Sequence, residues 1–109
     1  MQRFKVTLRT DSGIPKLMRK YCRKNGISIW KFLSDVTKER LQQPLNFSIA
    51  EIEEMRQRPY EKNVETERFD FGISDTIAIE QLRIIKEEYG IALNTFFVRI
   101  ISEKLQPKL

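Results

Sequence analysis

The stretches RFKVTLR (Arg3 to Arg9) and RFDFGIS (Arg68 to Ser74) decide the fold, because each alternates apolar residues with polar or small ones. The apolar residues fall on one face of each stretch: Phe4, Val6 and Leu8 in the first, and Phe69, Phe71 and Ile73 in the second. Alternation with a period of two is typical of a half-buried strand. The sequence therefore predicts one short strand at the start of each half of the chain.

A helical pattern follows each strand, in the same order in both halves. KNGIS (Lys24 to Ser28) aligns with EYGIA (Glu88 to Ala92), and KERL (Lys38 to Leu41) aligns with SEKL (Ser102 to Leu105). We expect Gly26 and Gly90 to end the first helix of each half as left-handed residues, and Ser28 to cap the second helix. Residues 3–43 and 68–107 thus form an internal repeat of strand, helix, glycine turn and helix.

Apolar residues at helical spacing predict which helix faces are buried. In the second helix of each copy they are Ile29, Trp30, Leu33, Val36 and Leu41, then Leu93, Phe96, Phe97, Ile100, Ile101 and Leu105. We therefore expect Trp30, Phe96 and Phe97 to be core residues rather than base-stacking surfaces. Cys22, the lone cysteine, is expected to be a small buried residue.

A single strand leaves its edges unpaired, and about 40 residues is marginal for an independent core. Two copies solve both problems if their strands pair and their helices interlock. The predicted fold is mainly α-helical with a short antiparallel two-stranded β-ribbon, in which two strand-helix-helix repeats form an intramolecular pseudo-dimer. The predicted units are residues 1–43 and 67–109, which share one core, joined by a connector at 44–66.

The connector carries a capping box, Ser48 to Glu51, that predicts a short helix. Its acidic residues Glu51, Glu53 and Glu54 are expected to be solvated rather than to bind a metal. An apolar stripe of Ile49, Ile52 and Met55 can cover this chain's own core or receive a protein partner.

Composition argues against catalysis. The 109 residues include no histidine, which removes the commonest general base and an imidazole metal ligand, and we find no glycine-rich phosphate loop or nucleophile elbow. We expect no enzymatic activity, no cofactor, no metal and no small-molecule substrate. No apolar run approaches the ~20 residues that cross a bilayer, and the N-terminus lacks a signal-peptide pattern, so we expect a cytoplasmic protein without a membrane partner.

The repeated pattern resembles the ribbon-helix-helix family of DNA-binding proteins over roughly residues 2–43 and 67–106. In that family two subunits each supply one strand, and the ribbon enters the major groove. Both strands lie on one chain here, so the resemblance implies a tandem, single-chain member. The Gly-x-Ser pattern at Gly26 to Ser28 matches the family, whereas Ala92 replaces the serine in the second copy.

The resemblance, together with the polar positions of the strands, implies two groups of contacts with double-stranded DNA. Base contacts are expected from Arg3, Lys5, Thr7, Arg9, Asp70 and Ser74. Phosphate contacts are expected from Gly26, Ser28, Lys31, Arg68 and Asn94. The exposed-strand pattern is equally compatible with mere solvation at Asp70, Gly72 and Ser74. The basic cluster Lys16, Arg19, Lys20, Arg23 and Lys24 is either a solvated face or a second phosphate-facing surface.

The net charge of +5 is unevenly distributed. Residues 1–43 hold 11 basic and 3 acidic residues, residues 44–66 hold 3 and 5, and residues 67–109 hold 6 and 7. We therefore expect the first repeat to supply most of the contacts with DNA phosphates. We also expect the target site to be asymmetric.

Three functions remain open from the sequence. The leading one is sequence-specific binding of double-stranded DNA, either as a transcriptional repressor or as an accessory factor at the transfer origin of a mobile element. Binding of further copies of the protein on adjacent sites is left open. The second is an antitoxin-like protein-interaction module that uses the connector stripe. In the third, the second repeat serves only for dimerisation.

Overall fold

The computed structural model describes residues 3–11, 13–57 and 64–106, so parts of the predicted terminal units and of the connector lie outside the described residues. The elements in chain order are β1 (Phe4–Asp11), α1 (Gly13–Asn25), α2 (Ile29–Leu41), α3 (Ile49–Met55), β2 (Thr66–Ile73), α4 (Thr76–Glu87) and α5 (Leu93–Leu105). The predicted mainly helical fold with a two-stranded antiparallel sheet is confirmed.

The two strands pair along their whole length. β1 and β2 run antiparallel in a register that joins Phe4 to Ile73 at one end and Asp11 to Thr66 at the other. Val6 and Phe71 are cross-strand partners, as are Leu8 and Phe69, and all four side chains are buried. The inward face of the ribbon is therefore apolar around these two pairs, as the period-two pattern predicts, and it ends on the buried polar residue Thr10 of β1.

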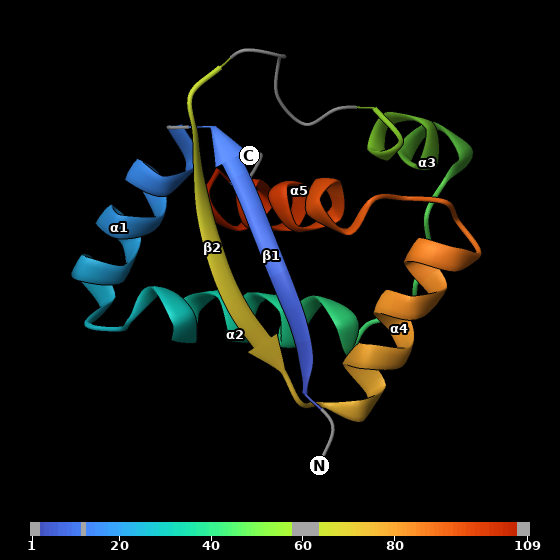
Figure 1. Ribbon diagram of the computed structural model, residues 1–109, viewed down its shortest axis with the longest axis horizontal. Coiled ribbons are helices and arrows are strands. Elements are labelled where there is room, and N and C mark those ends of the chain that lie inside the picture. The colour runs from blue at the N-terminus through green and yellow to red at the C-terminus, as the bar shows by residue number, and fades with distance from the viewer. Residues whose placement is uncertain (1–2, 12, 58–63, 107–109) are drawn as a thin grey trace.

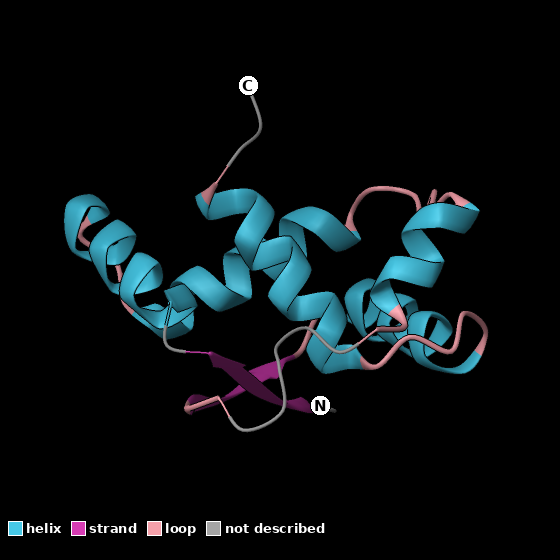
Figure 2. Cartoon of the chain, turned by 90° about the horizontal axis from the view of Figure 1, so that it is seen from above, coloured by secondary structure: helices cyan, strands magenta, loops and turns pink. Residues whose placement is uncertain are grey.

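The helices cover the inward face of this ribbon. α2 and α5 cross behind the strands, whereas α1 and α4 lie toward opposite sides of the molecule (Figure 1). Seen from above, the ribbon lies at one side of the molecule, and the helices lie together on the other side of it (Figure 2). Phe97 of α5 links the layers, because its ring meets the ring of Phe71 edge-on at 5.5 Å between centroids.

Local signals set the helix ends. Gly26 and Gly90 have φ angles of 64° and 65°, the left-handed conformation predicted for residues that end a helix. Ser28 caps α2 by accepting a hydrogen bond from the backbone N–H of Lys31. Asp75 caps α4 in the same way, whereas Ala92 gives α5 no side-chain cap.

The connector helix α3 packs onto the second half of the chain. Met55 is buried and Ile52 packs against the core, while Ile49 is 77% exposed. Arg99 of α5 forms ion pairs with the connector, and its partners there are Glu51 and Glu54. The apolar stripe and the acidic residues of the connector thus each make contacts within this chain through two of their three residues.

Trp30 corrects one prediction, because its side chain is 58% exposed rather than part of the core. The buried aromatic residue of α2 is Phe32, which is 1% exposed. Residues two positions apart point to nearly opposite sides of a helix, so Trp30 and Phe32 cannot both face the core. The predictions for Phe96, Phe97 and Cys22 are confirmed, since all three are buried.

Candidate nucleic-acid interface

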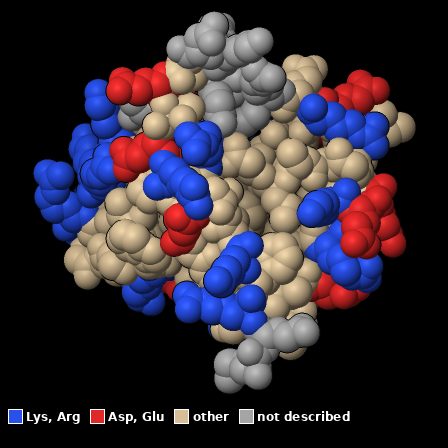
Figure 3. Space-filling view, viewed as in Figure 1, with Lys and Arg blue, Asp and Glu red and all other residues tan. Residues whose placement is uncertain are grey.

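One polar surface, which we call the outward face, covers the side of the ribbon that points away from the helices. It consists of Arg3, Lys5, Thr7, Arg9, Arg68, Asp70 and Gly72. All of these except Gly72, which is half-buried, are exposed. Four cations and one carboxylate leave the outward face with a net positive charge, and several groups of lysine and arginine atoms lie across the middle of the space-filling view (Figure 3).

The centre of the outward face is a hydrogen-bonded cluster around Asp70. The hydroxyl of Thr7, its cross-strand partner, donates to Asp70 Oδ1 at 2.9 Å. Arg68 Nε lies 3.2 Å from both carboxylate oxygens. The Thr7 hydrogen bond and then the Arg68 guanidinium hold the pKa of Asp70 below its usual value. Asp70 is therefore a fixed negative charge among positive ones.

The remaining outward residues surround this cluster. Arg9 Nη1 donates to the hydroxyl of Thr66 at 3.2 Å. The Arg3 side chain lies so close over Gly72 that a Cβ atom there would overlap it. Lys5 lines the same shallow depression as Arg3 and Gly72. Ser74 follows the last residue of β2 and is exposed.

The predicted phosphate-binding residues of the first half come together at the start of α2. Gly26, Ser28 and Lys31 are all exposed there. Lys31 Nζ pairs with Asp35 at 3.1 Å, one helical turn further on, and both side chains are more than half exposed. Exposed pairs of this kind are weak, so Lys31 remains available to another anion. Arg68 belongs to the outward face instead.

Asn94, the predicted phosphate residue of the second half, bonds to the ribbon itself. The Arg9 backbone N–H donates to Asn94 Oδ1 at 2.7 Å, and Asn94 Nδ2 donates to the Arg9 carbonyl oxygen at 2.9 Å. Trp30 occupies the same position in the first half, since each is the second residue of its helix. Its indole N–H donates to the Asp70 carbonyl oxygen at 3.1 Å. Each ribbon edge is thus tied to a helix start, which the sequence did not reveal.

Asn94→Ala should lower the free energy of unfolding by about 1 kcal/mol, because it removes both hydrogen bonds that tie β1 to α5. Urea denaturation measures the change. Asn25→Ala is the matched control, since Asn25 makes one exposed bond to a helix carbonyl, and we expect a loss below about 0.5 kcal/mol there. Equal effects of the two substitutions would show that the ribbon edge needs no such tie.

The helices beside the ribbon differ in charge. The exposed face of α1 carries Lys16, Arg19, Lys20, Arg23 and Lys24, and α1 contains no acidic residue. Of these, Arg19 pairs with Glu67 of β2. On α4, Arg83 pairs with Glu80 and with Glu87, and these carboxylates raise the pKa of the guanidinium. Blue gathers over α1 and mixes with red over α4 (Figure 3).

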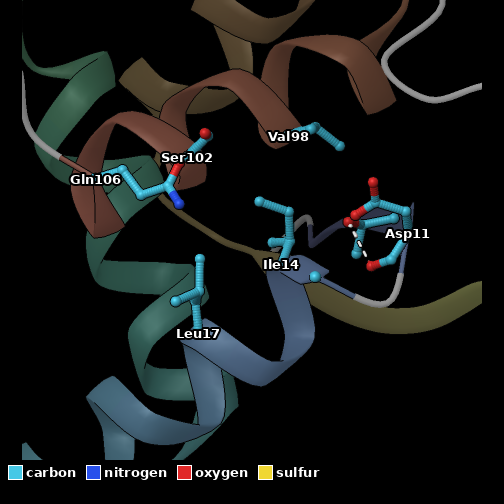
Figure 4. Close-up of a pocket in the computed structure, with 8 residues that line it drawn as sticks. Asp11, Ile14, Leu17, Val98, Ser102 and Gln106 are labelled. Carbon is cyan, nitrogen blue, oxygen red and sulfur yellow. Dashed lines mark hydrogen bonds between the residues drawn. The ribbon is translucent and has the colours of Figure 1, made fainter.

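A second depression lies between the start of α1 and the end of α5 (Figure 4). Its wall mixes apolar side chains with uncharged polar ones, among them Ile14, Leu17, Val98, Ser102 and Gln106, and Asp11 lies at one side. No predicted site residue lies in it. The candidate site is therefore the outward face together with the start of α2.

Within the described residues, no group of three or more histidine, cysteine, aspartate or glutamate side chains is placed to hold a metal ion. No helix in the same part of the chain has the length and apolar character to cross a membrane. Comparison of the chain with protein families, curated proteins and solved structures finds no match.

Proposed function

We propose that this protein binds double-stranded DNA sequence-specifically by inserting the outward face of its ribbon into the major groove, and that it is not an enzyme. The observation that carries the proposal is the two-sided ribbon. One face is buried against α2 and α5, while the other presents Arg3, Lys5, Arg9 and Arg68 with hydrogen-bonding groups between them. Such an array can bind a polyanion that itself presents hydrogen-bond donors and acceptors at a regular spacing.

The dimensions favour this proposal. Strands of eight residues are about 26 Å long and lie about 4.8 Å apart. The major groove of B-form DNA is about 12 Å wide and 8.5 Å deep, and it admits a two-stranded ribbon. Side chains at alternate positions then point toward the base edges, where the four base pairs present different patterns of donors and acceptors.

Each side chain has a distinct role in this proposal. Lys5 and Arg9 donate to guanine O6 and N7, with Arg3 at the end of the ribbon, while Thr7 and Ser74 bond to either type of group. Asp70 accepts a hydrogen bond from a cytosine amine, and this bond replaces those that Asp70 accepts from Thr7 and Arg68 in the free protein. Arg68 and the residues at the start of α2 contact phosphates, which set affinity and register but carry no sequence information.

We further propose that the two halves of the chain act as a pseudo-dimer, so that one molecule presents a complete ribbon. The internal pairing of β1 with β2 and the matching order of elements support it. Sedimentation at low protein concentration tests this proposal: a monomer that still binds its site is expected. If the protein binds DNA only as a dimer of two chains, the result would instead favour the alternative in which the second half serves for dimerisation.

The proposed biological role is that of a transcriptional repressor or of an accessory factor at the transfer origin of a mobile element. Only the resemblance to ribbon-helix-helix proteins supports either role. Because the two strands present different side chains, the target site is expected to be asymmetric in both cases. Footprints that extend beyond one site would indicate copies bound side by side.

The decisive experiment is selection of bound sequences from random duplex DNA, repeated with Lys5→Ala and Arg9→Ala at two salt concentrations. Each substitution should weaken specific binding by about 1–3 kcal/mol and relax the selected sequence at one position. Lys86→Ala on α4 is the control and should leave the selected sequence unchanged. If wild-type protein selects no sequence, or if neither ribbon variant alters the selection, the ribbon does not read bases.

DNA affinity should stay constant between about pH 5.5 and pH 7, because the chain has no histidine to gain charge there. The pKa of the Asp70 carboxyl is lowered in the folded protein by its bonds to Thr7 and Arg68. These bonds therefore stabilise the fold at pH values above the unfolded-state pKa of Asp70, and this stabilisation is lost as the pH falls through the lower folded-state pKa. Fluorescence anisotropy of a labelled duplex at constant ionic strength measures the DNA affinity across this pH range. A marked rise in affinity within that range would indicate a titrating group outside the outward face.

A further inference from the structure

Trp30 is an exposed aromatic side chain beside the outward face. It is the only tryptophan in the sequence, and 58% of its side chain is accessible to solvent. The bond from its indole N–H to the Asp70 carbonyl oxygen holds the ring at the free edge of β2, next to the residue at the centre of the outward face. An exposed ring held at this place is within reach of a ligand that binds the outward face.

The chemistry of the ring limits what it can contact. Its single donor is already used by the Asp70 carbonyl oxygen, so the ring offers an apolar surface. The bases of an intact duplex are stacked and give no face to an external ring. The apolar surface within reach at the wall of the groove is the deoxyribose of the backbone, where many protein contacts to DNA are made.

We propose that Trp30 packs against the sugar-phosphate backbone that borders the groove occupied by the ribbon, an inference that rests on the proposed DNA binding. The cations of the outward face bring that backbone close. The contact is one-sided, because Asn94 takes the equivalent place at the other edge and offers a polar amide already bonded to Arg9. It also lies on the half of the chain that carries the basic helix α1.

The single tryptophan makes the contact directly measurable. A duplex obtained by selection is labelled and titrated while its anisotropy and the tryptophan emission are followed in parallel. The emission should change with the same midpoint as the anisotropy, and quenching by acrylamide should fall about twofold or more in the complex. Trp30→Ala should weaken binding about three- to tenfold, and Trp30→Phe, which keeps an aromatic ring, should weaken it less.

The outcomes separate this inference from the function on which it rests. If anisotropy reports binding while the emission and the acrylamide accessibility of Trp30 stay as in the free protein, the backbone contact is wrong and DNA binding stands. If no duplex changes the anisotropy, the proposed function itself is wrong. The wild-type emission decides between these results even if Trp30→Ala fails to fold.

Discussion

Phe97→Ala is expected to lower the free energy of unfolding by about 3–5 kcal/mol, the usual range for removing a fully buried phenylalanine. Phe97 has no exposed surface and its ring lies edge-on to Phe71 and Phe96, at 5.5 and 5.6 Å between centroids. Its loss removes the support of the ribbon as well as core volume. Domains of this size have only about 5–15 kcal/mol of stability, so urea denaturation should show a large fall in the midpoint.

Ile49→Ala is the matched control for this loss. It also replaces a large apolar side chain with alanine, but Ile49 is 77% exposed, so the change should stay within about 0.5 kcal/mol. A Phe97→Ala protein as stable as the control would mean that α5 does not support the ribbon in the way described.

Charge reversal on α1 should have the second large effect. The double substitution Lys20→Glu with Lys24→Glu is expected to weaken duplex binding by about 10- to 100-fold at low salt and to reduce the slope of log affinity against log salt by about 2. Both lysines are exposed on a helix without acidic residues, so reversal turns attraction for phosphate into repulsion. Anisotropy titrations over a range of salt concentrations measure both quantities.

Lys86→Glu with Lys104→Glu is the control that matches this change in net charge. Both lysines are exposed. Lys86 lies on α4, which also carries Glu80 and Glu87, and Lys104 of α5 pairs with Glu39 at 3.5 Å. We expect a loss of affinity several times smaller than on α1. Equal losses from the two double variants would show that only overall charge matters and that the first half has no special role.

Much of the fold was predictable because local signals coincide with it. The alternation around Val6 and Phe71 predicts the inward face of the ribbon, and Gly26 and Gly90 mark the helix ends by a conformation that favours glycine. The exposure of Lys5, Thr7 and Arg9 follows from the same alternation. These features depend on neighbours in the sequence.

The features that were not predictable depend on contacts between distant segments. Trp30 was predicted to be buried because apolar spacing does not say which of two aromatic residues faces the core, and Phe32 occupies that place. The bonds from Asn94 to Arg9 depend on how α5 meets β1. The cluster of Thr7, Asp70 and Arg68 depends on the strand register, which neither strand specifies by itself.

The pairing of β1 with β2 inside one chain has a consequence for how the outward face can change during evolution. In a ribbon made by two identical chains, a mutation of one codon alters two symmetric positions at once. Here Thr7 and its partner Asp70 are encoded separately, so either can be replaced while the other is kept. Each side of the ribbon is therefore free to diverge independently, one amino acid at a time.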